Sequence, residues 1–309
     1  MKTKVVVLLI FFQLILISFL SYHIHQKQKN ILGVVSVNPI KKENLVFKPS
    51  DKFKYFYESK PNTIEKVNEW VPYKGIYTIN SDSLNERFDY PIKKIKKTYR
   101  IIILGNSFTY GLYVNTKDNW TEQLEDRLNQ QKEWCPNITK FEVINLGMHG
   151  YDIQYLIERF KLRGIKYEAD MVIWLMNDND FFQINEIMLK KAEFYQKQMS
   201  ENGELEKQSK SGNLYPAWDR ALRELKTQYD KKSLEKYQLD QLTQFRKNIY
   251  RGTLLFLTFP VTSLDHKSIL KDVTHSFVQT YFSDEIINIY DESRESLYFP
   301  NDGHPNQNG

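Results

Sequence analysis

The chain is poor in cysteine and carries little excess charge of one sign. Only one of its 309 residues is a cysteine, Cys135, which excludes an intramolecular disulfide and a cysteine-based zinc cluster. The net charge is only +5, from 43 basic and 38 acidic residues, and basic runs such as Lys93 to Lys97 are short. Such runs are more typical of a solvated surface than of a nucleic-acid footprint, so no nucleic-acid partner is expected.

Low-complexity repeats are also absent, whereas apolar and aromatic residues are plentiful. Hydrophobic residues make up 41% of the chain, which contains 20 Tyr, 19 Phe and 5 Trp. This is enough material for a real core, so general disorder is excluded. The length allows one large domain with accessories or two ordinary domains.

The N-terminus contains an uncharged apolar run from Val5 to about Ile24, preceded by Lys2 and Lys4. A membrane-spanning helix needs about 20 such residues, and preceding positive charges place its start in the cytoplasm. A cleavable signal peptide is the alternative, but no A-x-A-like site is found before His25. We therefore predict that residues 1–24 form an uncleaved, single-pass anchor in the cell membrane, with the remainder outside the cytoplasm.

Beyond the predicted anchor, the chain has two parts of different composition. Residues 25–98 are polar and mixed, and we interpret them as a juxtamembrane linker and a lead-in with short strands near Gly75 to Ile79. From residue 99 onward, buried strands alternate with amphipathic helices, which is typical of an α/β domain with a parallel sheet. Strands are expected within 100–104, 141–147, 169–178, 252–260 and 286–291, and helices within 120–131 and 153–165.

A charged helical segment at about 183–247 is too long for an ordinary connection and is expected to be an inserted cover over the cleft. The stretch Asn213 to Trp218 within it offers aromatic surface of a kind that suits sugar rings.

Polar residues follow four of the predicted strands. "GNS" ends at Ser107, "NLGMHG" at Gly150 and "NDND" at Asp180, and Asp302 and His304 follow the last strand. Ligands of parallel α/β sheets bind beyond the carboxyl ends of the strands. We therefore expect one cleft to collect all four segments.

This set of residues suits acyl transfer. A serine nucleophile needs a base to take its proton and a carboxylate to orient that base. Ser107, His304 and Asp302 could supply the serine, the base and the carboxylate. The backbone N–H groups of Ser107 and Gly150 and the amide of Asn179 could form the oxyanion hole. Ser107 could instead be only the cap of the following helix, as serines often are.

The ordered blocks "GNSFTYG", "NLGMHG", "NDND" and "DGHPN" resemble the SGNH hydrolases, the GDSL-type esterases. The resemblance runs from Arg100 to the C-terminus and implies a flavodoxin-like, three-layer α/β/α fold. It matches Ser107 to the nucleophile, Gly150 and Asn179 to the oxyanion hole and His304 to the base. It also implies that the enzyme uses no metal or cofactor.

The blocks depart from the family pattern at three places. The family's Gly-Asp-Ser reads Gly-Asn-Ser, and Asn177 stands where the third block usually has glycine, so either Asn177 or Asn179 could point into the hole. The common Asp-x-x-His spacing would place the acid at position 301, which is Asn301. Asp302, two residues before His304, resembles the shorter spacing of some polysaccharide-modifying branches and is the expected acid.

These observations predict a serine esterase or deacylase that acts outside the cytoplasm. Its expected substrates are O-acyl, foremost O-acetyl, esters of a cell-surface glycan. Two alternatives stay open on the same fold. One is an O-acyltransferase that uses the same triad, and the other is a non-catalytic glycan-binding or scaffold protein.

Overall fold

The computed structural model of the protein describes residues 45–47, 52–67, 73–131, 133, 135–176, 178–204, 216–258, 278–281, 299 and 304–308. They form two short antiparallel ribbons, one parallel sheet and the helices around it. The strands are β1 (Leu45–Phe47), β2 (Tyr57–Ser59), β3 (Thr63–Lys66), β4 (Ile76–Ile79), β5 (Thr98–Leu104), β6 (Lys140–Asn145), β7 (Met171–Met176), β8 (Thr253–Thr258) and β9 (Val278–Tyr281). The main helices are α2 (Ser107–Tyr110), α3 (Trp120–Gln130), α4 (Ile153–Arg159), α5 (Asn185–Glu201), α7 (Pro216–Gln228) and α8 (Lys231–Gln244).

The large sheet confirms the predicted parallel α/β architecture. Its strand order is β6-β5-β7-β8-β9, and every neighbouring pair is parallel. Numbered from β5 along the chain, this is the 2-1-3-4-5 order of flavodoxin-like folds. The fifth strand described is β9, whereas the strand predicted at 286–291 lies outside the described residues.

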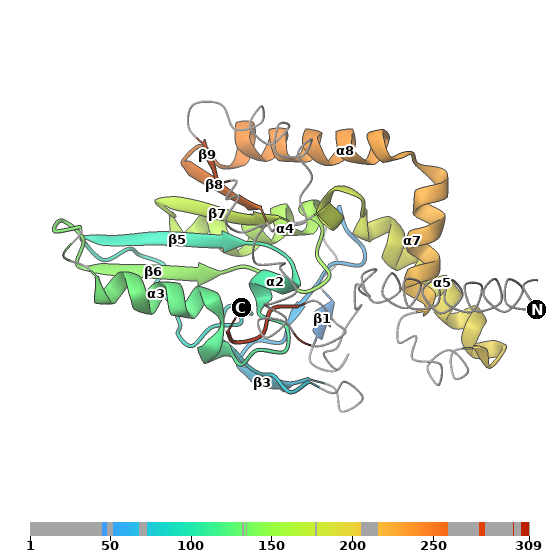
Figure 1. The fold of residues 1–309 in the computed structure, drawn as a ribbon, viewed down its shortest axis with the longest axis horizontal. Coiled ribbons are helices and arrows are strands. Elements are labelled where there is room, and N and C mark those ends of the chain that lie inside the picture. The colour runs from blue at the N-terminus through green and yellow to red at the C-terminus, as the bar shows by residue number, and fades with distance from the viewer. Residues whose placement is uncertain are drawn as a thin grey trace, which may run out of the picture.

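Alternate residues of β5 face opposite helices. Ile101 and Ile103 pack toward α3 in one apolar cluster, and Ile102 and Leu104 belong to the larger cluster that includes α4 and α8. Figure 1 shows the same arrangement, with α3 on one side of the sheet and α4 and α8 on the other. Since both faces are covered, β5 carries apolar residues at consecutive positions rather than at alternate ones.

The carboxyl ends of the strands meet the C-terminal residues of the chain. In Figure 1, α2 follows the end of β5, and the C-terminus lies beside α2. Segments far apart in sequence therefore come together where parallel sheets bind their ligands.

The lead-in residues 52–67 and 73–98 share the core of the sheet domain. Phe56, Tyr77 and Leu84 are fully buried and belong to the same apolar cluster as Ile102 of β5. The ribbon strands β1 and β2 pair with each other, as do β3 and β4, and β4 confirms the short strand predicted near Gly75 to Ile79.

A buried ion pair fastens the lead-in to α4. The Nη1 of Arg159 lies 2.9 Å from Oε1 of Glu58, and neither side chain is exposed. Arg159 also donates through Nε to the carbonyl of Leu146 (3.1 Å) and through Nη2 to that of Ser83 (2.8 Å). Arg163 contacts the same glutamate, so the charge of Glu58 is shared by two guanidinium groups. One arginine thus joins three segments of the chain.

The helical insert forms a second, smaller core. Met188 of α5, Trp218 and Leu225 of α7 and Leu234 of α8 pack together, after which α8 returns to the main core. Trp218 is only 3% exposed. For Trp218, the prediction of aromatic surface offered to sugars is therefore wrong, because α7 turns this side chain inward against its neighbours. Residues 213–215 of the same predicted stretch lie outside the described residues.

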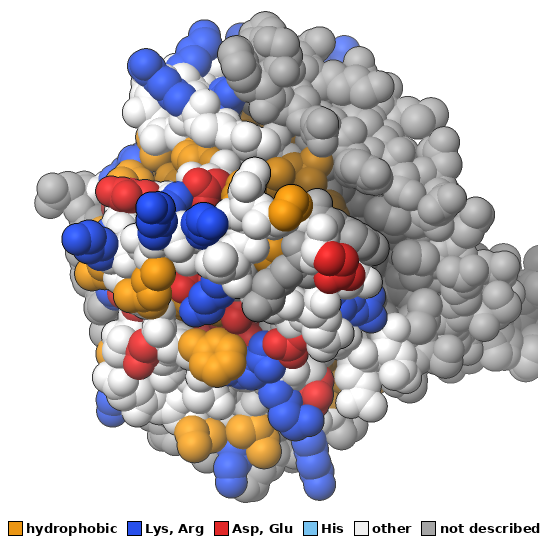
Figure 2. All heavy atoms as spheres, turned by 90° about the vertical axis from the view of Figure 1, so that its left-hand side faces the viewer, with side chains coloured by type: hydrophobic (Ala, Val, Ile, Leu, Met, Phe, Trp, Pro, Cys, Tyr) orange, Lys and Arg blue, Asp and Glu red, His pale blue; other side chains and the backbone are white. Residues whose placement is uncertain are grey.

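The end of the molecule at which the strands begin is mixed in charge. Figure 2 shows this face, on which Lys and Arg side chains are interspersed with Asp and Glu. Near the strand starts, Lys94 pairs with Asp170 (2.6 Å) and Lys140 with Glu142 (3.0 Å). Opposite charges thus offset one another locally.

The predicted anchor, residues 1–24, lies outside the described residues. Within the part of the chain that the structure describes, no helix has the length and apolar character needed to cross a membrane.

Several buried carboxyl groups, among them Glu65, Asp152 and Glu86, have raised pKa values. Burial raises the pKa of Glu65 to about 7, although the hydroxyl of Tyr110 donates to it (3.1 Å). Burial raises the pKa of Asp152 to about 6, and burial together with neighbouring Glu122 raises that of Glu86 well above its usual range. Each group binds its proton more tightly in the folded chain than in the unfolded chain. Their contribution to stability is therefore lost as pH rises.

We expect Glu65→Gln to flatten the pH dependence of stability. The contribution of Glu65 is fully present below about pH 4.5 and is lost as pH rises through about 7. The difference in unfolding free energy between pH 5 and pH 8 should shrink by about 1–3 kcal/mol in the variant. Urea unfolding across this range measures it, with Glu201→Gln on the exposed end of α5 as control. An unchanged pH dependence in Glu65→Gln would contradict this account.

Candidate active site

Ser107 is the first residue of α2, directly after the turn that ends β5. The cap of this helix is Asn106, whose Oδ1 accepts a hydrogen bond from the backbone N–H of Phe108 (3.1 Å). The interpretation of Ser107 as a mere helix cap is therefore wrong, because the neighbouring asparagine fills that position. The hydroxyl of Ser107 is left available for another partner.

The turn before Ser107 requires glycine. A Cβ atom on Gly105 would lie 2.1 Å from Oγ1 of Thr109 and 3.0 Å from the carbonyl oxygen of Leu175. The chain can therefore pass from the buried strand into α2 so tightly only without a side chain at this position. This tight passage holds Ser107 at the carboxyl end of the sheet.

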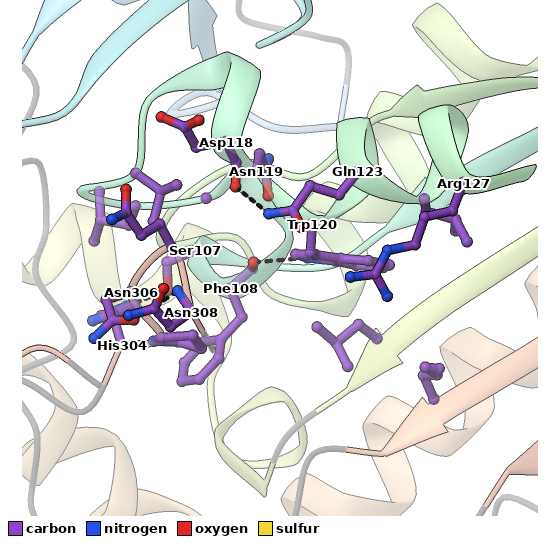
Figure 3. Close-up of a pocket in the computed structure, with 18 residues that line it drawn as sticks. Ser107, Phe108, Asp118, Asn119, Trp120, Gln123, Arg127, His304, Asn306 and Asn308 are labelled. Atoms are coloured by element: carbon purple, nitrogen blue, oxygen red, sulfur yellow. Dashed lines mark hydrogen bonds between the residues drawn. The ribbon is translucent and has the colours of Figure 1, made fainter. Parts of the chain in front are cut away.

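His304 lies against the serine, as predicted. Its Nε2 is 2.7 Å from Oγ of Ser107, across a separation of 197 residues in the chain. The imidazole is only 7% exposed, and its ring packs beside those of Phe108 (5.0 Å between centroids) and Tyr113 (5.7 Å). Figure 3 shows His304 and Ser107 close together at one end of a pocket. Two aromatic rings thus hold the imidazole of His304 in contact with the hydroxyl of Ser107.

The second block runs beside the first. The backbone N–H of Met148 donates to the carbonyl of Gly105 (3.1 Å). Ser107 lies two residues after Gly105, and Gly150 lies two residues after Met148. Gly150 has φ +73°, which favours glycine, and in the described part of the chain its N–H has no acceptor. The structure therefore brings the predicted oxyanion-hole glycine to the turn next to the serine.

The third block is joined to the first by a contact that the motif pattern does not predict. Nδ2 of Asn106 donates to Oδ1 of Asp180 (3.0 Å), which is only 2% exposed. The backbone of Asn179 lies in the short 3₁₀ helix Asp178–Phe181, next to Asp180, while its side chain lies outside the described structure. The asparagine that replaces the family's aspartate thus links two blocks. The altered motif residue was the only sequence signal for this link.

The structure does not describe two further residues of the predicted site. Asp302, the expected acid of the triad, and Asn177, the alternative oxyanion-hole residue, lie outside the described residues. Their roles stay predictions.

His149, between the two glycines of the second block, is fully buried. Burial lowers its pKa to about 3, with a smaller contribution from the charge of His304, so the ring is neutral near pH 7. Neither ring nitrogen has a hydrogen-bond partner among the residues described. His149 is therefore placed to shape the turn rather than to carry protons.

A pocket of about 500 Å³ opens beside the Ser107–His304 pair. Figure 3 shows the pair at one end, Trp120 in the middle and Arg127 farther along α3. The indole N–H of Trp120 donates to the carbonyl of Phe108 (3.1 Å), which fixes the ring next to α2. The pocket offers far more room than an acetyl group needs. Its lining includes Phe108, Trp120, Leu124, Arg127, Leu175, Leu257 and residues Pro305 to Asn308.

No family model and no curated protein matches the chain by sequence. Among solved structures it is similar to a two-domain esterase active on acetylated mannans, at 14% identity and a TM-score of 0.40, covering 69% of this chain and 45% of that one. It is also similar to the psychrotrophic esterase EstA from Pseudoalteromonas sp., at 12% identity and a TM-score of 0.39, covering 67% of this chain and 88% of that one. A third, described as a lipolytic protein of the G-D-S-L family from Desulfitobacterium hafniense, has 20% identity, a TM-score of 0.22 and coverages of 54% and 81%.

The chain spans less than half the length of the mannan esterase that it matches. The sheet order and the contact between Ser107 and His304 agree with the resemblance that the motif blocks showed. Both features are those that the resemblance to the SGNH hydrolases implies.

Proposed function

We propose that the chain is a serine esterase that removes acyl groups from oxygen. The observation that carries this proposal is the 2.7 Å contact between Oγ of Ser107 and Nε2 of His304. A serine hydroxyl becomes a useful nucleophile only when a base within hydrogen-bond reach accepts its proton. This pair meets that requirement at the carboxyl end of a parallel sheet, beside a pocket.

The reaction follows from this geometry. Oγ of Ser107 attacks the ester carbonyl carbon while Nε2 of His304 takes its proton. The carbonyl oxygen becomes an oxyanion, which the N–H groups of Ser107 and Gly150 and the side chain of Asn179 would stabilise. The carbon–oxygen bond to the alcohol then breaks, and His304 returns the proton to the departing alcohol.

The second half of the reaction repeats these steps with water. His304 takes a proton from water, whose oxygen attacks the acyl-enzyme. The bond to Ser107 then breaks, and the serine recovers its proton while the carboxylic acid leaves. Asp302, two residues before His304, is proposed to orient the imidazole and to stabilise its charged form.

We propose O-acyl, foremost O-acetyl, groups on a cell-surface glycan as substrates. The pocket supports this, because its aromatic Trp120 and the amide side chains of Asn306 and Asn308 are groups that pack on sugar rings and bind hydroxyls. Membrane anchoring by the apolar run from Val5 to about Ile24, with the catalytic part outside the cytoplasm, belongs to the same proposal.

Labelling with a fluorophosphonate probe tests the proposal. Such probes phosphonylate a serine that a neighbouring base activates, so we expect one adduct per chain, located at Ser107 by peptide mass analysis. Heat-unfolded protein should lose the labelling, since the contact with His304 then no longer exists. Failure of the folded protein to react would favour the non-catalytic alternative and would end the esterase proposal.

A further inference from the structure

The peptide bond between His149 and Gly150 is held by a residue far upstream. The hydroxyl of Tyr57, on β2 of the lead-in, donates to the carbonyl oxygen of His149 at 2.8 Å. A peptide unit is planar, and its C=O and N–H point in opposite directions. A hydrogen bond that fixes the His149 carbonyl therefore also fixes the direction of the Gly150 N–H.

The peptide on the other side of Gly150 is held as well. The Nδ2 of Asn185, the first residue of α5, donates to the carbonyl oxygen of Gly150. Asn185 is itself fixed, because its backbone N–H donates to Oδ2 of Asp152 at 2.7 Å. Glycine has more conformational freedom than any other residue, so an unrestrained Gly150 would sample many orientations of its N–H. Two hydrogen bonds from separate segments remove that freedom.

Tyr57 is itself well placed and remains a donor. Its side chain is 3% exposed, its ring packs against that of Tyr151 (5.2 Å), and its own carbonyl accepts a hydrogen bond from the Tyr151 hydroxyl. Burial raises the pKa of Tyr57 far above its usual value, so the hydroxyl keeps its proton at all ordinary pH values. A Cβ atom on Gly150 would lie 2.8 Å from this hydroxyl, so the contact is close.

We propose that Tyr57 and Asn185 are positioning residues for the oxyanion hole, which hold the two peptides around Gly150 so that its N–H points at the reacting carbonyl oxygen. Neither residue belongs to the four motif blocks. The proposal rests on the proposed esterase function. It adds that the lead-in and the first residue of α5 contribute to transition-state stabilisation without touching the substrate.

Tyr57→Phe tests the first half of the proposal. The phenyl ring keeps the packing and removes the hydrogen bond to His149. Because loss of a whole oxyanion-hole donor costs on the order of 10²–10³ in rate, a poorly oriented donor should cost about 10- to 100-fold in kcat with KM nearly unchanged. Tyr250→Phe is the matched control, because its partly buried hydroxyl also donates to a backbone carbonyl, that of Thr253 (3.0 Å), at the opposite end of the sheet.

Asn185→Ala tests the second half and keeps the proposal falsifiable if Tyr57→Phe fails to fold. The Oδ1 of Asn185 has no partner in the described structure, so the variant chiefly loses the bond to Gly150. As for Tyr57→Phe, we expect kcat to fall, here by about 10-fold or more, while KM stays nearly unchanged.

Inhibition by an alkyl boronic acid separates positioning from a general structural role. Its tetrahedral adduct with Ser107 places an oxygen in the oxyanion hole. The inhibition constant should therefore rise in parallel with the fall in kcat/KM in both variants, and Tyr250→Phe should change neither. If the wild type is active and both variants keep its kcat and its inhibition constant, this inference alone is overturned. A wild-type protein without esterase activity or probe labelling would instead overturn the proposed function.

Discussion

Replacement of Ser107 by alanine is expected to lower kcat for p-nitrophenyl acetate by about 10⁴- to 10⁶-fold, the range typical for loss of a serine nucleophile. The variant loses the atom that attacks the carbonyl carbon. His304 remains, but it has no hydroxyl to deprotonate. The residual rate would come from the oxyanion hole and from substrate binding alone.

The fold of this variant should be intact, because the side chain of Ser107 neither caps α2 nor fills the core. Initial rates and circular dichroism of the purified protein measure the two effects separately. Ser200→Ala, which removes an exposed hydroxyl from α5, is the matched control and should match the wild type. Full activity of Ser107→Ala would end the hypothesis of a serine nucleophile.

Replacement of Arg159 by methionine should lower the free energy of unfolding more than any other substitution that we propose. The guanidinium group is fully buried, and it pairs with Glu58 and donates to the carbonyls of Leu146 and Ser83. Methionine fills part of the space but leaves the carbonyl oxygens of Leu146 and Ser83 without this donor, and it leaves Glu58 paired with Arg163 alone. Breaking a buried ion pair in this way costs about 3–5 kcal/mol.

Urea unfolding followed by circular dichroism measures this loss. Lys117→Met, which removes a pair between Asp118 and a largely exposed lysine, is the control and should change stability by less than about 1 kcal/mol. A loss below about 1 kcal/mol in Arg159→Met would show that the lead-in does not depend on this contact.

The sheet and the serine–histidine pair could be predicted because both leave local signals. A strand covered on two faces needs consecutive apolar residues, as in Ile101 to Leu104, and parallel strands align their carboxyl ends. Once the strands were located, the residues after them had to meet. The meeting of Ser107 with His304 follows from this rule and not from their distance along the chain.

The roles of the lead-in residues could not be predicted. Glu58, Glu65 and Glu86 are charged residues of a lead-in whose composition is polar and mixed, yet all three are buried, because their partners lie elsewhere in the sequence. The contact of Tyr57 with His149 spans 92 residues and leaves no periodicity or motif. A hydrogen bond between one hydroxyl and one carbonyl is visible only in the folded chain.

The burial of the lead-in bears on how a catalytic fragment of this protein should be prepared. The motif blocks begin at Arg100, and a truncation guided by them would start there. Such a fragment would lack Phe56, Tyr77 and Leu84 and would expose the apolar surface that they cover. It would also lack the hydroxyl that fixes the turn at Gly150. The smallest soluble unit worth expressing therefore starts before residue 52, well upstream of the first recognisable motif.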